Sequence, residues 1–244
     1  MIARVAVLPQ PPLLVPELVA GPDPQAQQVR DECVAVARRL TDVATRWVAI
    51  AADATTVQPE ELGPDAAGTF QGYGVDVRVS LGAASATATA DPAMSLPALI
   101  AGWLRERAGA EQVRVRLVPP SLPARDSQEL GERLVAGFDS ADPVGLLVLG
   151  DGSHRHGERA VGRPDERAAR FDEQVRRALA AVDLAGLLAL DPQLAASLGA
   201  VGRAPWQVLS GALGRDGRDW RCVHSRLLIP FGVAYHLAVW DPVR

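Results

Sequence analysis

The chain has 244 residues, 48% of them apolar and 22% charged, and its formal net charge is −4. This composition is typical of a soluble globular protein, and the mildly acidic balance gives no electrostatic reason to expect a nucleic acid or an anionic membrane as a partner. All 25 basic residues are arginine, which excludes mechanisms that need a Schiff-base lysine or a P-loop lysine. No apolar run reaches membrane-spanning length and the first residues lack a signal-peptide pattern, so we expect a cytoplasmic protein.

Strands are predicted to alternate with helices along the whole chain. Apolar or strictly alternating runs of strand length are followed by stretches with apolar residues at helical spacing. The predicted strands are 2–8, 47–52, 75–80, 113–118, 146–149, 222–228 and 234–240. The predicted helices are 25–45, 97–107, 126–138 with Asp126 as its cap, one that starts at 163–166 and continues through 179, and shorter pieces at 184–190 and 192–198.

This alternation predicts one layered α/β domain over residues 1–244, with helices flanking a central sheet. We expect the sheet to be mixed but largely parallel, because 75–80 and 113–118 alternate strictly, as half-exposed strands do. Residues 58–74 predict an irregular loop at the rim of the sheet. Residues 82–90 contain only Gly, Ala and Thr with one Ser and predict a mobile loop.

The densest set of titratable side chains lies in residues 150–158, directly after a predicted strand. Ligand and catalytic residues of α/β proteins lie beyond the carboxyl ends of strands. His154 is a candidate general acid or base, oriented by Asp151, because the pKa of imidazole lies near neutral pH. A loop histidine hydrogen-bonded to the backbone is the alternative for the same residue.

Three further residues are candidates for contacts with a substrate. Gln10 lies in a proline-bounded turn after the first predicted strand, and Asp53 directly follows the second. Ser153 suits a turn or cap better than a nucleophile, because no Gly-x-Ser-x-Gly pattern surrounds it. A plain turn for Gln10 and a cap for Asp53 remain open. His156 and Glu158 have charged neighbours, which indicates a solvated loop.

The remaining cysteines and histidines do not indicate a metal site. Cys33 lies on the apolar face of a predicted helix, where it is expected to be a small core residue. Cys222 and His224 are two apart, but no further ligand follows at metal-binding spacing. His224 and His236 lie in predicted strands and are expected to be surface or satisfied core histidines.

Several short motifs, in order along nearly the whole chain, resemble the class III extradiol ring-cleavage dioxygenases of the subunit-B type. These motifs are residues 9–17, 150–154, 171–202, 206–213 and 230–235. The resemblance implies the layered α/β fold of that family. It also implies a non-haem Fe(II) site of two histidines and one glutamate, with catechol and O₂ at the open positions. A further histidine acts as acid and base in such enzymes, and His154 matches it.

The same resemblance implies that the iron ligands are not retained. Gln10 stands at the first ligand position, and Asp53 is the metal-binding side chain nearest the second. The glutamate is expected shortly before Trp206, where residues 202–205 include no carboxylate. Glutamine is a weak neutral ligand and one carboxylate does not hold Fe(II) tightly. We therefore predict no metal ligands and no resident cofactor.

These observations predict a dioxygenase-like protein with a degenerate iron site. Its pocket around Gln10, Asp53 and His154 is expected to bind a small phenolic or carbonyl-bearing molecule and to lack ring-cleavage activity. One alternative is an active dioxygenase or another metal-dependent or acid/base enzyme that uses Asp151, His154 and His156. The other is a non-catalytic binding or assembly subunit. The family pairs unlike subunits or repeats one, which implies a homodimer as one assembly.

Overall fold

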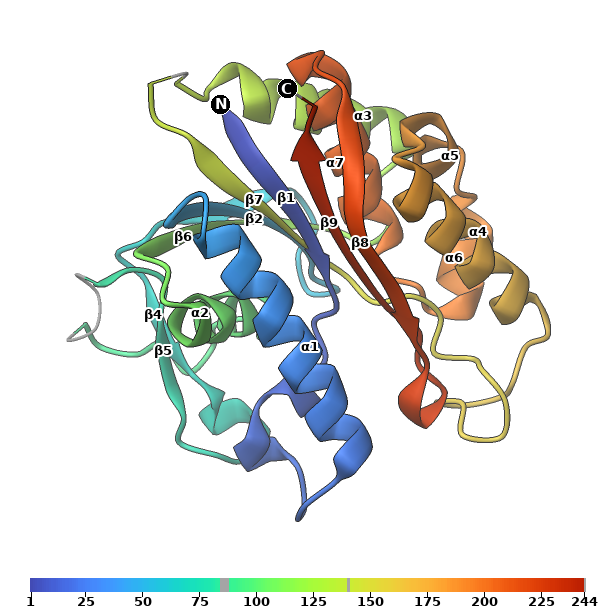
Figure 1. Ribbon diagram of the computed structural model, residues 1–244. Coiled ribbons are helices and arrows are strands. Elements are labelled where there is room, and N and C mark those ends of the chain that lie inside the picture. Colours follow the sequence, from blue (N-terminus) through green and yellow to red (C-terminus); the bar gives the residue numbers. More distant parts are fainter. Residues whose placement is uncertain (84–87, 140, 244) are drawn as a thin grey trace.

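The structure, a computed structural model, describes residues 1–83, 88–139 and 141–243. A seven-stranded sheet runs through the molecule, with helices on both of its faces (Figure 1). In spatial order its strands are β3 (Glu60–Leu62), β6 (Gln112–Val118), β2 (Arg46–Ala52), β7 (Val144–Leu149), β1 (Ile2–Leu8), β9 (Tyr235–Pro242) and β8 (Trp220–Leu228). The predicted layered α/β fold is confirmed.

The four central strands β6, β2, β7 and β1 are parallel to one another. At one edge β3 runs antiparallel to β6, and at the other β9 and β8 continue the sheet in antiparallel fashion. Strands β2 and β7 read as nearly continuous apolar runs because both of their faces are buried. The sheet is therefore mixed and largely parallel, as predicted.

The strands that make the sheet mixed differ from those predicted. The run at 75–80 forms only β5 (Arg78–Ser80), which pairs with β4 (Ala67–Thr69) in a separate two-stranded sheet. The predicted loop at 58–74 contains β3, β4 and a 3-10 turn at Phe70–Tyr73. Strands of three residues are too short to show a period in sequence. Of the predicted mobile loop at 82–90, residues 84–87 lie outside the described part of the chain.

Two helices, α1 (Pro24–Thr41) and α2 (Leu96–Ala108), cover one face of the sheet. Asp23 caps α1 by accepting hydrogen bonds from the backbone N–H groups of Gln25 and Ala26. Pro24 occupies the first helical position, where its missing N–H costs nothing. Helix α1 therefore begins one residue before the predicted start and ends four residues before the predicted end. Cys33 is buried on its inner face, as predicted.

On the opposite face, the described part of the chain forms five helices, which pack around a second apolar cluster. They are α3 (Ala124–Ala136), α4 (Arg167–Ala181), α5 (Leu184–Leu188), α6 (Pro192–Leu198) and α7 (Arg203–Asp216). The prediction that Asp126 caps a helix is wrong, because α3 begins two residues earlier with Pro123 at the capping position. Asp126 instead lies in the first turn, where its charge complements the helix dipole.

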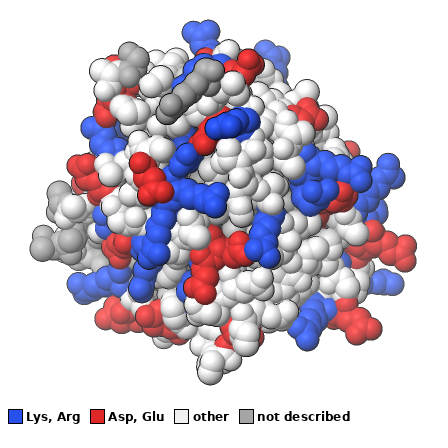
Figure 2. Space-filling model, viewed as in Figure 1, with Lys and Arg blue, Asp and Glu red and all other residues white. Residues whose placement is uncertain are grey.

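The surface mixes charges of both signs. On the face shown in Figure 2, arginines and acidic residues are interspersed with uncharged side chains. Within the described residues, no helix combines the length and the apolar character that crossing a bilayer requires.

Candidate functional site

The carboxyl ends of β1 and β7 form a topological switch point. These strands are parallel neighbours, but the chain leaves β1 toward α1 on one face and leaves β7 toward α4 on the other (Figure 1). Diverging connections leave a crevice beyond the strand ends, and ligands of open α/β sheets bind there.

Gln10 and Asp151, which follow β1 and β7, contact each other at this point. The backbone N–H of Gln10 donates to Asp151 Oδ1 at 2.9 Å, and its side-chain Nε2 donates to the carbonyl of Ala52 at 2.8 Å. Gln10 is only 7% exposed, and its Oε1 is buried without a hydrogen-bond partner. A buried polar oxygen without a partner is costly. Oε1 thus has unused capacity to accept a hydrogen bond.

The carboxyl group of Asp151 lies in surroundings that disfavour its charge. Burial raises the pKa of Asp151 to about 7, although the hydrogen bond from Gln10 acts in the opposite direction. Burial and then the nearby Asp151 charge also raise the pKa values of Tyr235 and Cys33. A carboxyl group with a pKa near 7 can gain or lose a proton at neutral pH, as a general acid or base must.

Asp151→Asn is expected to stabilise the protein at about pH 8 and to have little effect near pH 4. The folded pKa of about 7 lies above that of an unfolded aspartate, so the unfolded state loses its proton first and stability falls as the pH rises between the two values. Above pH 7, the free energy of unfolding of Asp151→Asn should exceed that of the wild type by roughly 4 kcal/mol. Urea unfolding across this pH range measures it. Parallel pH profiles for the wild type and the variant would contradict the burial of the Asp151 charge.

Asp53 stabilises the turn that follows β2. Its Oδ1 accepts the backbone N–H of Thr55 at 3.0 Å, and its Oδ2 accepts the hydroxyl groups of Thr55 and Thr56 at 2.9 and 3.2 Å. This matches the capping role that the sequence left open. Gln10 lies near Asp53 in the folded protein, because Nε2 of Gln10 donates to the carbonyl of Ala52, the residue before Asp53. A substrate contact by Asp53 remains a prediction.

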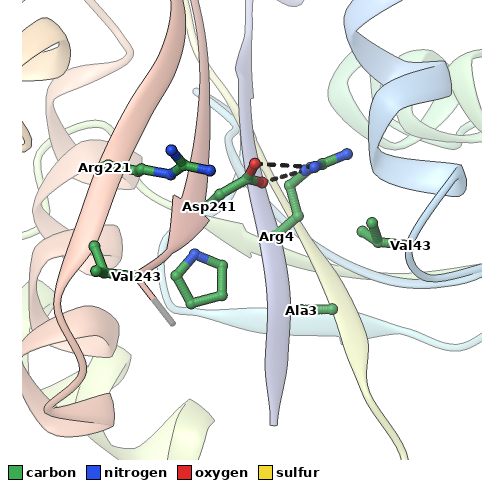
Figure 3. A pocket seen from close by; sticks show the side chains of 7 residues that line it. Ala3, Arg4, Val43, Arg221, Asp241 and Val243 are labelled. Carbon is green, nitrogen blue, oxygen red and sulfur yellow. Dashed lines mark hydrogen bonds and ion pairs between the residues drawn. The ribbon is translucent and has the colours of Figure 1, made fainter.

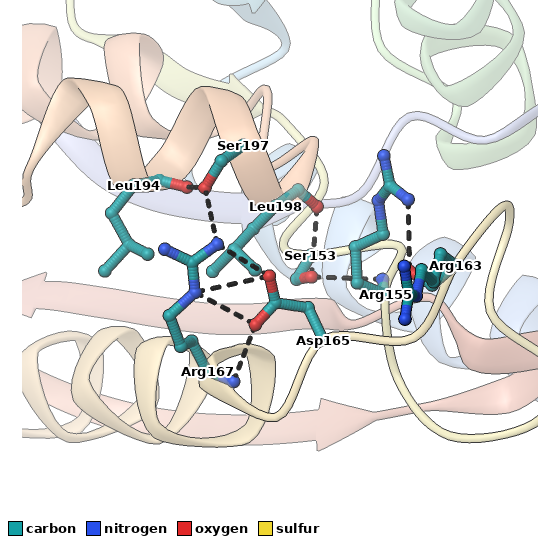
Figure 4. Close-up of polar contacts among 8 residues, drawn as sticks. All are labelled: Ser153, Arg155, Arg163, Asp165, Arg167, Leu194, Ser197 and Leu198. Atoms are coloured by element: carbon teal, nitrogen blue, oxygen red, sulfur yellow. Dashed lines mark hydrogen bonds and ion pairs between the residues drawn. The ribbon is translucent and has the colours of Figure 1, made fainter.

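Ser153 has a structural role in the loop after β7 (Figure 4). Its hydroxyl donates to the carbonyl of Leu198 at 3.0 Å and accepts the backbone N–H of Arg155 at 3.1 Å. In the same loop, Arg167 holds the pKa of Asp165 at about 2 through side-chain hydrogen bonds. The polar groups around Ser153 therefore fix the course of the loop, which agrees with the predicted turn role.

His154 is held by the backbone of its own loop. Its Nδ1 lies 2.9 Å from the carbonyl of Val161. A carbonyl can only accept, so Nδ1 carries the proton and a neutral ring keeps its lone pair on Nε2. The ring packs against Gly199, where an added Cβ would lie 1.8 Å from Nε2. Within the described residues, no hydrogen bond joins His154 to Gln10 or Asp53, and its acid/base role remains a prediction.

The titratable side chains of residues 150–158 do not converge. Asp151 contacts Gln10, whereas Nε2 of His156 lies 2.6 Å from Asp172 Oδ2. Glu158 is exposed. An enzyme that needs Asp151, His154 and His156 in one site has no support in this arrangement. The prediction that His156 lies in a solvated loop is wrong, because its side chain is 11% exposed and paired.

Asp172 on α4 is a buried carboxylate that the sequence analysis missed. It accepts hydrogen bonds from Nε2 of His156 and, at 2.9 Å, from Nε2 of His236. The backbone N–H of Ser153 donates to both of its oxygens at 3.2 and 3.3 Å. Burial alone raises the pKa of Asp172, but the hydrogen bonds from the two histidines outweigh it and hold that pKa below its usual range. His236 is thus a core histidine that pairs through Nε2, but its Nδ1 is buried without a hydrogen-bond partner among the described residues, so the prediction of a satisfied histidine holds only in part.

Gly150 and Gly152 provide close packing between elements. A Cβ on Gly150 would lie 2.4 Å from the Cα of Gly202, and one on Gly152 would lie 2.2 Å from Asp172 Oδ1. Side chains at these positions would push α7 and α4 away from the strand end. The contacts of both glycines are with the protein itself.

The residues at the implied iron-ligand positions do not fit an Fe(II) facial triad. Both oxygens of Asp53 are used by threonines. Arg203 stands in the segment where the glutamate is expected, and its buried guanidinium lines the same cavity as Ala54. A buried cation at this place repels a divalent metal ion. Across the described ranges, no three His, Cys, Asp or Glu residues are grouped to hold a metal.

A separate cavity of about 440 Å³ lies at the amino end of β1 (Figure 3). Arg4 and Asp241 form an ion pair on its wall, and Arg221 lies near them. Ligands of parallel sheets bind at the opposite, carboxyl ends of the strands. This cavity is therefore not the candidate site.

No protein-family model and no curated protein matches the chain. Among solved structures, it is similar to the crystal structure of the uncharacterized protein JW3007 from Escherichia coli K12. The TM-score is 0.54 at 13% sequence identity, and the match covers 98% of this chain and 99% of the other. At this identity, the similarity shows that the two proteins share a fold over their whole length.

Proposed function

We propose that this chain is a small-molecule-binding protein related in fold to the class III extradiol dioxygenases, with no iron triad. Its ligand is a phenolic or carbonyl-bearing molecule held at the carboxyl ends of β1 and β7. The observation that carries the proposal is the buried, unpartnered Oε1 of Gln10 next to a carboxyl group with a pKa of about 7.

The orientation of the Gln10 amide determines which ligand group it accepts. The Ala52 carbonyl can only accept a hydrogen bond, so it holds Nε2 toward itself and leaves Oε1 to face the ligand. A phenol hydroxyl can donate to this oxygen. An ether or an aromatic ring without a donor cannot, and it would leave Oε1 unpaired.

Asp151 adds a proton-transfer group to the same site. In its neutral form it can donate to a ligand carbonyl, and in its ionised form it can accept the proton of a phenol. Asp151 as a whole residue keeps partial exposure to solvent. His154 remains the predicted second acid/base group, and a homodimer remains a prediction from the resemblance alone.

Titration with phenol and with its methyl ether, anisole, tests the proposed site. The wild type is expected to bind phenol at least tenfold more tightly than anisole, because only phenol satisfies the Gln10 oxygen. Gln10→Leu removes the acceptor and should abolish this preference. Gln27→Leu, at an exposed glutamine of α1, is the matched control and should keep it. Calorimetry measures both affinities, with a melting curve to confirm that each variant folds.

Equal affinity for phenol and anisole in the wild type would contradict the donor requirement. An unchanged preference in Gln10→Leu would show that phenol binds elsewhere on the protein.

A further inference from the structure

A cavity of about 450 Å³ lies beside α6 and the loop that precedes α7. It adjoins the carboxyl ends of β2 and β6, since Ala54 and Pro120 contribute to its wall. Most of its lining side chains are small and apolar, among them Ala195, Ala196 and Val201. Neither Gln10 nor Asp151 lines it, and none of the lining residues is acidic. The cavity thus lies outside the contact between Gln10 and Asp151, although Ala54 follows Asp53 and Gly199 lies against the ring of His154.

Arg203 provides the charge in this cavity. Its side chain is 1% exposed, and burial lowers its pKa. Nη1 donates to the carbonyl of Leu122 and, at 2.8 Å, to Oε1 of Gln207, while Nη2 donates to the carbonyl of Pro120. All three partners are neutral, and Arg203 has no ion pair within the part of the chain that the structure describes. A buried charge without a counterion is unfavourable.

Two N–H groups of Arg203 make no hydrogen bond within the described residues. A guanidinium has five N–H groups, and three of them donate to the partners above. Nε is buried without a partner, and one N–H of Nη2 is left over. Where two such N–H groups share an edge, they match the two oxygens of a carboxylate.

We propose that this cavity is a second binding site, which takes a monocarboxylate with a compact apolar body. The carboxylate pairs with these two N–H groups of Arg203, and the body packs against the alanine, proline and valine side chains of the wall. This inference holds whether or not Gln10 and Asp151 bind a phenol.

Benzoate is the probe, and benzamide and inorganic phosphate are its controls. Benzamide has the same shape without the charge, and phosphate has charge without the apolar body. We expect saturable benzoate binding by calorimetry, and binding at least tenfold weaker for each control. Failure of benzoate to bind, or equally tight binding of phosphate or benzamide, would overturn the proposal.

Two variants test whether benzoate binds at Arg203. Arg203→Lys keeps the positive charge but loses the two-donor edge, and it should bind benzoate at least tenfold more weakly. Arg105→Lys is the matched control: Arg105 is a buried arginine of α2 outside this cavity, and benzoate binding should not change. Arg203 also connects α7 to the loop after β6. The affinity of Arg203→Lys for benzoate is therefore interpreted only if the melting curve of this variant shows a folded protein.

Ala196→Phe tests the cavity while Arg203 stays intact. Ala196 is exposed on α6 and lines the cavity, so a phenyl group there is expected to fill the space and abolish benzoate binding without unfolding the protein. Wild-type affinity in this variant would overturn the proposal, even if Arg203→Lys does not fold.

Discussion

Asp172→Ala is expected to lower the free energy of unfolding by roughly 3–5 kcal/mol. The substitution leaves His156, His236 and the backbone N–H of Ser153 without their shared acceptor inside the protein. It also disconnects the loop after β7 from α4 and β9. Urea unfolding at neutral pH measures the loss.

Glu173→Ala is the matched control for this prediction. Glu173 is the next residue of α4, but its ion pairs with Arg176 and Arg177 are at the surface. Exposed ion pairs contribute little to stability, so unfolding of this variant should resemble that of the wild type. Similar losses for the two variants would contradict a special role for the buried carboxylate.

The contribution of Asp172 has a defined pH dependence. The pKa of Asp172 is lower in the folded protein than in the unfolded chain. Its carboxylate therefore stabilises the folded protein fully above the pKa of an unfolded aspartate, which is about 4. This stabilisation is lost as the pH falls through the folded pKa. The difference in stability between the wild type and Asp172→Ala should therefore shrink only in strongly acidic solution.

Gly131→Ala and Gly211→Ala are each expected to destabilise the protein by about 3 kcal/mol or more. These glycines let the backbones of α3 and α7 meet. A Cβ on Gly131 would lie 2.1 Å from the carbonyl oxygen of Val208, and one on Gly211 would lie 2.1 Å from that of Gln128. Both obstacles are backbone atoms of a packed helix, which cannot rotate away. Thermal and urea unfolding measure the effect.

Gly214→Ala should have the opposite sign. Gly214 lies in the same helix, α7, and an added Cβ meets nothing within 4 Å. Alanine in an open helical position is favoured over glycine by about 1 kcal/mol. Wild-type or higher stability of Gly131→Ala and Gly211→Ala would contradict the close contact of α3 with α7.

The sequence predicted most of the long elements in order, because their apolar periods reflect burial in a layered fold, but the predicted helices did not include α7. It did not predict the α3–α7 contact. In the sequence, Gly131 and Gly211 are only residues of low helix propensity. The packed structure shows that they are needed for the close approach of α3 and α7. Strands β3 and β4 were missed because three residues are too few to show an alternating pattern.

The candidate site was predicted only in part. The resemblance placed Gln10 at the site, but Asp151 was assigned to His154 as a partner, and its contact with Gln10 spans 141 positions of the chain. One feature of the sequence could have identified Asp172 as a buried carboxylate. It is a carboxylate on the apolar face of α4, next to Phe171, and four residues after Ala168. Pairing it with His156 and His236 required the tertiary structure.

The central claim is that the chain binds a phenolic ligand without the iron of the family it resembles. Metal analysis of protein purified with Fe(II), followed by catechol titration with and without EDTA and by turnover under O₂, tests it most directly. We expect substoichiometric iron, catechol binding that EDTA does not change, and no ring cleavage. Stoichiometric iron together with ring-cleavage activity would contradict it.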